Sequence, residues 1–297
     1  MALTLLDAAR LSRDLLFQGV IETVIEESPI LQLLPFETIQ GNSLKYTYEV
    51  APGTASFYAV NAPWTEGTAE LGTRTATLAI LGGDVDVDNF LARTMSDVVD
   101  QRATQLALKA KAVQRAFERA FITGDAAVDP HSFDGLRKLI PASQTLDAGA
   151  NGASLTLALL DQLIDMVRGG KPHLLLMSRR TRRKLKSLLV SSTHYVESVR
   201  LGEFGAGVLA YDGIPVAVSD YVPDDETLGS GSNLSSIYAL RFGWGEGLCG
   251  LQNGGIEVVE VGQLETKDAV RTRLRWYVGL ALFRDNACAR LRGLTAN

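Results

Sequence analysis

The chain has few of the residues from which disulfide frameworks and metal centres are built. Its 297 residues include only two cysteines and three histidines. Cys249 and Cys288 follow no metal-ligand spacing and are too few for a disulfide framework, so we expect two reduced, buried thiols. His131, His173 and His194 are scattered and show no paired spacing for zinc. We therefore expect neither a metal site nor a cofactor.

Long apolar runs are missing as well. The run WYVGLALF (residues 276–283) is far shorter than the roughly 18 residues that a membrane span needs. The opening segment MALTLLDAARLSRDLLF is interrupted by Asp7, Arg10, Arg13 and Asp14, which argues against a secretory signal. We therefore expect a soluble protein that stays in a cytoplasm and has no membrane partner.

Motifs of catalysis and ligand binding are incomplete. GEGLCG (residues 245–250) has the spacing of a dinucleotide-binding loop, but a strand pattern follows it where a helix is needed. DVDVDN (residues 84–89) begins like a calcium loop, but Asn89 and Met95 stand where that loop needs Gly and Glu. The alternating aspartates of this segment instead predict a strand with an acidic face. Without a nucleophile elbow or a P-loop, the chain is not expected to be an enzyme.

Excess positive charge is also lacking, with one local exception. The net charge of −5 argues against a general nucleic-acid coat, which normally carries a basic excess. The exception is RRTRRKLK (residues 179–186), which places six basic side chains in eight positions. A buried strand pattern, PHLLLMS, precedes it, and we expect Ser178 to cap the helix that follows.

Apolar positions within this basic helix decide how we interpret it. Thr181, Leu185 and Leu189 recur on one face, so the basic side chains occupy the rest of the circumference. We favour a solvated face that meets acidic groups of a neighbouring subunit. Nucleic-acid contact is the alternative, although no aromatic residues are interleaved. The candidate interface residues of this helix are Arg179, Arg180, Arg182 and Arg183.

Clear periodicities mark the first part of the chain. Residues 3–34 predict two amphipathic helical pieces, and we expect Pro29 and Pro35 to break the helix. Residues 44–50, LKYTYEV, alternate between apolar and polar side chains, which predicts a half-buried strand. Residues 91–121 carry apolar side chains at spacings of three and four, which predicts a helix of about 31 residues.

A long segment between this strand and this helix lacks a core-forming pattern. Residues 51–81 are rich in small polar residues, Gly and Pro, with strand-like ends. Such a length is uncommon inside a compact domain, so we expect an extended hairpin that leaves the body. Phe57, Tyr58 and Trp64 lie within it, and large aromatic side chains on a projecting loop indicate a surface for a partner.

The remaining segments complete an α+β pattern. We expect Gly124 to cap the long helix, residues 155–167 to form another helix, and residues 224–236 to form a polar surface loop. From Ser236 onwards the chain is rich in strand patterns. Long helices combined with mostly antiparallel strands predict an α+β fold rather than a regular βαβ repeat.

The order of these elements resembles the major capsid protein of tailed bacteriophages, which has the Hong Kong phage capsid fold. FERAFITGDAAVDPHSFDGLRKLI resembles the end of that family's spine helix, and WYVGLALFRDNACARLRGL resembles its C-terminal strands. The resemblance implies an N-terminal arm (1–40), an E-loop (41–88), a P-domain (89–150 and 256–297) and an A-domain (151–255).

The same resemblance implies a structural function. Copies would assemble into hexamers and pentamers of an icosahedral virion shell, formed in the bacterial host cytoplasm around double-stranded DNA. The implied partners are further copies, a portal protein, and a separate scaffold or decoration protein. No lysine occurs between Lys45 and Lys109, which argues against the covalent crosslinks of some members, and the short arm argues against a cleaved scaffolding segment. An encapsulin, a bacterial shell of the same fold that encloses an enzyme, is the alternative.

Overall fold

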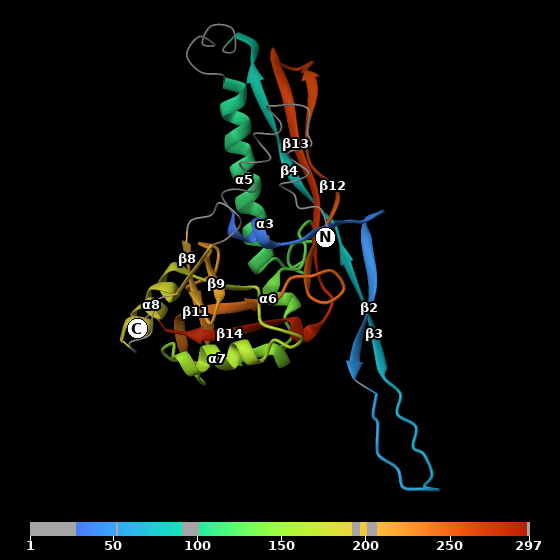
Figure 1. The fold of residues 1–297 in the computed structure, drawn as a ribbon. Coiled ribbons are helices and arrows are strands. Elements are labelled where there is room, and N and C mark those ends of the chain that lie inside the picture. The colour runs from blue at the N-terminus through green and yellow to red at the C-terminus, as the bar shows by residue number, and fades with distance from the viewer. Residues whose placement is uncertain (1–27, 52, 91–100, 192–196, 201–206, 296–297) are drawn as a thin grey trace.

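In the described part of the chain, three sheets form the framework (Figure 1). The computed structural model describes residues 28–51, 53–90, 101–191, 197–200 and 207–295. A four-stranded sheet and one long helix form a tall upper part, an eight-stranded sheet with two covering helices forms the lower body, and a two-stranded hairpin extends away from both. Helices beside mostly antiparallel strands confirm the predicted α+β class.

The four-stranded sheet is built from segments that lie far apart in the sequence. Its order is β1-β12-β13-β4, with β1 parallel to β12 and the other neighbours antiparallel. The bounds are Phe36–Thr38 for β1, Leu248–Gln263 for β12, Ala269–Leu282 for β13 and Ala79–Asp88 for β4. The long helix α5, Gln101–Thr123, runs beside the sheet along the direction of its strands.

The prediction for α5 is correct at its C-terminal end, and residues 91–100 lie outside the described residues. The helix ends at Thr123, but Gly124 is not a left-handed cap. A Cβ atom at Gly124 would lie 2.3 Å from the carbonyl oxygen of Phe133 and 2.5 Å from that of Ala120. The position therefore requires glycine because two backbone segments approach each other closely.

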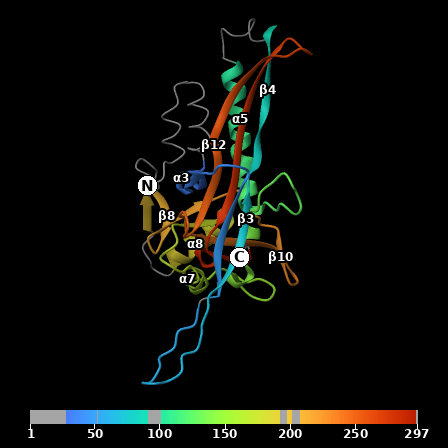
Figure 2. The same cartoon turned by 90° about the vertical axis from the view of Figure 1, so that its right-hand side faces the viewer.

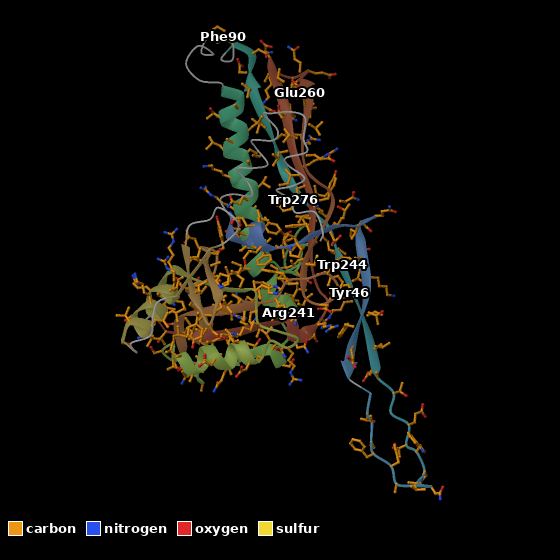
Figure 3. All side chains as sticks on the ribbon, viewed as in Figure 1. Tyr46, Phe90, Arg241, Trp244, Glu260 and Trp276 are labelled. Carbon is orange, nitrogen blue, oxygen red and sulfur yellow. The ribbon has the colours of Figure 1, made fainter. Side chains whose placement is uncertain are left out.

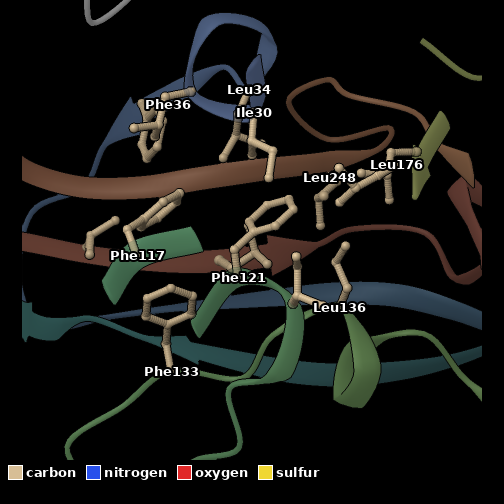
Figure 4. Packing of buried hydrophobic residues seen from close by; sticks show 14 of the residues in the cluster. Ile30, Leu34, Phe36, Phe117, Phe121, Phe133, Leu136, Leu176 and Leu248 are labelled. Carbon is tan, nitrogen blue, oxygen red and sulfur yellow. The ribbon is translucent and has the colours of Figure 1, made fainter. Parts of the chain in front are cut away.

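An aromatic cluster joins α5 to the four-stranded sheet (Figure 4). Phe117 is fully buried, and its ring centroid lies 5.0 Å from Trp276 of β13, 6.0 Å from Phe36 of β1 and 5.8 Å from Phe133. Phe121, one helical turn further along α5, packs at 5.9 Å from Phe117. Because these rings come from four separate segments, burying them fixes the helix on the sheet.

The eight-stranded sheet has the order β5-β14-β11-β6-β9-β8-β7, and β10 pairs with β11. Its strands are Thr145–Asp147 (β5), Leu174–Met177 (β6), Glu197–Arg200 (β7), Gly207–Tyr211 (β8), Ile214–Val218 (β9), Glu226–Leu228 (β10), Gly231–Leu240 (β11) and Cys288–Leu294 (β14).

Strand β6 shows why the sheet is buried on both faces. Leu174 and Leu176 point into the core that includes Phe117, whereas Leu175 and Met177 pack under helices α7 (Leu157–Asp165) and α8 (Arg179–Ser191). The continuous apolar run of β6 is typical of a strand covered on both sides. Figures 1 and 2 show α7 and α8 on the outer side of this body.

Prolines flank the first described helix, and one loop prediction is wrong. Pro29 begins this helix, α3 (Pro29–Leu33), because proline is tolerated at the first helical position and the Ser28 side chain accepts a hydrogen bond from the Leu31 N–H. The extended backbone of Ser28 agrees with the predicted break at this position. Pro35 does follow the end of α3. The predicted helical pieces before residue 28 lie outside the described residues. The segment 224–236 is not a polar loop, since it holds β10 and most of β11.

Strand pairing shows how the hairpin and the C-terminal segment are divided between the sheets. The hairpin consists of β2 (Ser43–Ala51) and β3 (Glu70–Thr77), and β4 belongs to the four-stranded sheet through its pairing with β13. The C-terminal segment 256–297 is divided, because β14 pairs with β11 in the other sheet. Short helical turns, α6 (Leu136–Leu139), η1 (Ala142–Gln144) and η2 (Asp285–Ala287), connect these parts.

Candidate assembly surfaces

The hairpin tip, residues 53–69, presents large apolar side chains to solvent. Phe57 is fully exposed and Trp64 is 82% exposed, and Val60 between them is also exposed. Tyr58 stacks on Trp64 with ring centroids 4.5 Å apart, and its hydroxyl accepts a hydrogen bond from the Thr65 N–H at 3.0 Å. The sequence-predicted aromatic residues are therefore together, on an element that has no core of its own.

The base of the hairpin is fixed to the body (Figure 3). Tyr46 of β2 donates a hydrogen bond from its hydroxyl to the Leu282 carbonyl oxygen at 2.9 Å. Arg74 of β3 forms an ion pair with Asp285, and its guanidinium lies 4.0 Å from the ring centroid of Tyr48. Burial raises the pKa of Tyr46. The hairpin thus has an anchored base and an exposed apolar tip.

Sequence reasoning missed this anchor. Arg74 and Asp285 are separated by 211 positions, and Tyr46 and Leu282 by 236. The alternation of residues 44–50 shows that Tyr46 faces inward, but nothing local shows which strand it meets.

Helix α8 has the solvated basic face that its periodicity predicts. Thr181, Leu185 and Leu189 are buried, and Ser178 caps the helix by accepting a hydrogen bond from the Thr181 N–H. The structure separates the four candidate arginines into two pairs. Arg182 and Arg183 are exposed and have no carboxylate partner among the described residues.

The other two candidate arginines are partnered within their own chain. Arg179 forms an ion pair with Asp220 at 2.6 Å, and Arg180 donates to the Asn233 carbonyl oxygen at 2.9 Å. Asp224 lies 3.5 Å from Arg180. Of the four candidate arginines, Arg182 and Arg183 are therefore the two without a carboxylate partner in the part of the chain that the structure describes.

The acidic strand β4 is neutralised across the sheet. Arg271 contacts Asp86 at 2.6 and 2.8 Å, and Arg273 contacts Asp84 at the same two distances. These guanidinium groups hold the pKa of both carboxyls below the usual range. The aspartates therefore form a ladder of ion pairs, which confirms the predicted strand and leaves no calcium loop.

A family model described as SU10 major capsid protein matches residues 59–295, which span most of the chain. The chain belongs to the SU10 major capsid protein family. Major capsid proteins are structural proteins that self-assemble into the shell of a virion, and this one is a capsid protein of that kind. The match confirms the resemblance on which the capsid prediction rests.

Solved structures show the same fold. The holo-SrpI encapsulin of Synechococcus elongatus PCC 7942 has a TM-score of 0.69 at 20% identity, covering 90% of this chain and 88% of that one. The capsid of a native GTA particle has a TM-score of 0.68 at 16% identity, and the match covers 92% of this chain and 91% of that one. The structure from Microbacterium phage Oxtober96 has a TM-score of 0.63 at 14% sequence identity, and the match covers 90% of each chain. A comparison with curated proteins finds no significant match.

The remaining candidate sites of this capsid protein have structural roles. Cys249 and Cys288 are free and buried, and burial raises the pKa of each thiol to about 12. No helix follows Gly250 in the segment GEGLCG, because β12 has already begun. His173 accepts a hydrogen bond from the Phe242 N–H at 3.1 Å, and His194 lies outside the described residues.

Two further findings concern the described part of the capsid chain. There, no group of three His, Cys, Asp or Glu side chains is placed to hold a metal ion. Within the same residues, no helix is both long and apolar enough to cross a membrane.

Proposed function

We propose that copies of this capsid protein form hexamers and pentamers that close into an icosahedral shell around double-stranded DNA. The hairpin carries this proposal, because its base is anchored by Tyr46 and Arg74 while Phe57 and Trp64 stand exposed at its tip. The hairpin is the E-loop, the four-stranded sheet with α5 is the P-domain, and the eight-stranded sheet is the A-domain. A portal protein, and a separate scaffold or decoration protein, complete the particle in the host cytoplasm.

Contacts between subunits in this shell are non-covalent, and the protein has no enzymatic role. Each aromatic side chain at the tip buries roughly 150–250 Å² when it packs on a neighbour. One such contact is weak, but each further contact in a closed shell forms at high effective concentration. The absence of lysine from Tyr46 to Leu108 supports this, because the tip has no amine for an isopeptide crosslink.

Replacing Trp64 by Ala tests the hairpin's role. We expect a several-fold lower yield of particles and an unchanged melting temperature of the free subunit, because Trp64 is already exposed there. The yield is measured by sedimentation and negative-stain electron microscopy. Trp64→Phe is the matched control, since it keeps a large aromatic ring and should assemble. Equal particle yields for Trp64→Ala and the unmodified chain would refute this role.

In the shell, the basic face of α8 contacts solvent or a neighbouring subunit and does not bind DNA tightly. Tight binding to DNA phosphates would oppose the movement of DNA during packaging, and its affinity would depend strongly on salt. The exposed pair Arg182 and Arg183 is therefore the probe. Assembled shells of the unmodified chain and of Arg182→Gln/Arg183→Gln should bind duplex DNA equally weakly. Tight duplex binding that disappears in the double variant would assign α8 to DNA.

An encapsulin function is the second candidate, favoured by the fold likeness to the SrpI encapsulin. The two functions differ in what the shell contains. Shells purified from infected cells should hold nuclease-protected double-stranded DNA if the capsid proposal is correct. Shells that contain a single enzyme and no protected DNA would instead establish the encapsulin function.

A further inference from the structure

The chain contains two Asn-Gly dipeptides, Asn151-Gly152 and Asn253-Gly254. In such a pair the backbone nitrogen of the glycine can attack the side-chain amide of the asparagine before it, because glycine has no Cβ atom to hinder the approach. Both asparagines are exposed. Sequence and exposure therefore do not distinguish the two dipeptides, and the difference between them lies in how the fold holds each one.

The second dipeptide lies in a bulge of β12. The ladder between β12 and β13 skips from Gln252 to Ile256, so residues 253–255 have no register partner on β13. Gly254 and Gly255 have φ angles of +82° and +78°, in the left-handed region that glycine adopts readily. The backbone at this dipeptide is thus outside the regular pairing of the sheet and unusually free in conformation.

Little surrounds this bulge. Apart from its chain neighbours, a Cβ atom at Gly254 would have only the Glu257 carboxylate within 4 Å among the described residues, at 3.1 Å. The side-chain amide of Asn253 donates a hydrogen bond to the Gly41 carbonyl oxygen at 3.5 Å, which is longer than the roughly 2.7–3.2 Å usual for such a bond. The Gly254 nitrogen can therefore approach the amide with little to displace.

The first dipeptide is held by contacts on both of its reacting groups. The side-chain oxygen of Asn151 accepts a hydrogen bond from the Ser230 N–H at 3.0 Å. The Gly152 N–H, which would have to attack, donates to the Gly149 carbonyl oxygen at 3.2 Å. A Cβ atom at Gly152 would lie 2.7 Å from the Leu234 side chain, so this backbone is also tightly packed.

We propose that Asn253 is a site of spontaneous deamidation in the folded protein. The Gly254 nitrogen forms a bond to Cγ of Asn253, and the bond from Cγ to Nδ2 breaks. The proton of the Gly254 N–H leaves with the side-chain amino group as ammonia, which gives a five-membered succinimide. One water molecule then opens this ring at either carbonyl group and yields aspartate or isoaspartate. The site belongs to the folded subunit and does not require the shell.

Conversion changes the joint between β12 and the hairpin. The new carboxylate cannot donate to the carbonyl oxygen of Gly41, which lies two positions before β2 begins at Ser43. It also adds a negative charge close to Glu257, in a chain whose net charge is already −5. An isoaspartate additionally lengthens the main chain of β12 by one carbon atom. Conversion therefore weakens the contact between β12 and the segment that leads into the hairpin.

Peptide mapping of aged protein tests the proposal. The folded full-length chain is kept at neutral pH and physiological temperature, and samples taken over weeks are digested with trypsin in water enriched in heavy oxygen, which labels any conversion during digestion. Trypsin separates the dipeptides into residues 139–168 and 242–267. We expect aspartate and isoaspartate to accumulate roughly tenfold faster in 242–267, because two hydrogen bonds must break before Asn151 can react. Asn253→Gln is the matched control and should remove this product, since its ring would be one atom larger.

The same chain unfolded in guanidinium chloride separates the effect of the fold from that of the sequence. There both dipeptides should convert at similar rates, because the bulge and the hydrogen bonds are gone. Equal rates in the folded chain, or faster conversion at Asn151, would overturn the proposal. Conversion of Asn253 in the unfolded chain only would overturn it as well. A rate ratio that is the same in both states would show that the fold does not select the site.

Discussion

Replacing Glu226 by Gln removes one half of a buried ion pair in the eight-stranded sheet. Arg290 of β14 contacts the two carboxylate oxygens of Glu226 at 2.7 and 2.8 Å, and Ser236 donates a hydrogen bond to the same carboxylate at 2.5 Å. The side chains of Arg290 and Glu226 are only 9% and 7% exposed. Because Glu226→Gln leaves the guanidinium buried without a counter-charge, we expect the free energy of unfolding to fall by about 3–5 kcal/mol.

A second ion pair on the same strand supplies the control. Arg292 of β14 pairs with Asp147 at 2.5 Å, but these side chains are 42% and 44% exposed. Solvent screens such a pair, so Asp147→Asn should lower the free energy of unfolding by less than about 1 kcal/mol. Urea unfolding of the soluble subunit, followed by circular dichroism, measures both losses. Equal losses in the two variants, or a loss below about 1 kcal/mol for Glu226→Gln, would refute the argument from burial.

Three further predictions concern the core, the ion-pair ladder and the hairpin base. Phe117→Ala should lower the free energy of unfolding by about 3–5 kcal/mol, measured in urea, because its fully buried ring packs against four others. The lowered pKa values of Asp84 and Asp86 mean that their ion pairs stabilise the fold above the unfolded pKa of 3.8 and lose this effect as the pH falls through the folded values. The melting temperature should therefore fall more steeply below about pH 4 in the unmodified chain than in Asp84→Asn/Asp86→Asn, and parallel curves would contradict this. Arg74→Met should change the subunit's stability by less than about 1 kcal/mol, because its ion pair with Asp285 is partly exposed, yet speed amide hydrogen exchange in the hairpin.

Elements with a strong local period could be predicted from the sequence. The alternation of residues 44–50 predicts β2, and the apolar spacing of residues 91–121 predicts a helix whose C-terminal end lies within two residues of the end of α5. The apolar face of α8 identifies its basic residues as a solvated surface before any contact is known. In each case, side chains of one segment alone decide which face is buried.

Features that depend on distant partners could not be predicted in this way. Residues 224–236 have the polar composition of a loop. The carboxylate of Glu226 is buried because it pairs with Arg290, which lies 64 positions later in the sequence. Strand β4 alternates like the hairpin strands before it, and its sheet is decided by pairing with β13.

Assembly of the full-length chain tests the central claim most directly. The purified protein is examined by size-exclusion chromatography and negative-stain electron microscopy over a range of salt and protein concentrations. The account predicts closed shells or capsomer rings, with shells of megadalton size. A monomer or dimer that persists under all of these conditions would contradict it.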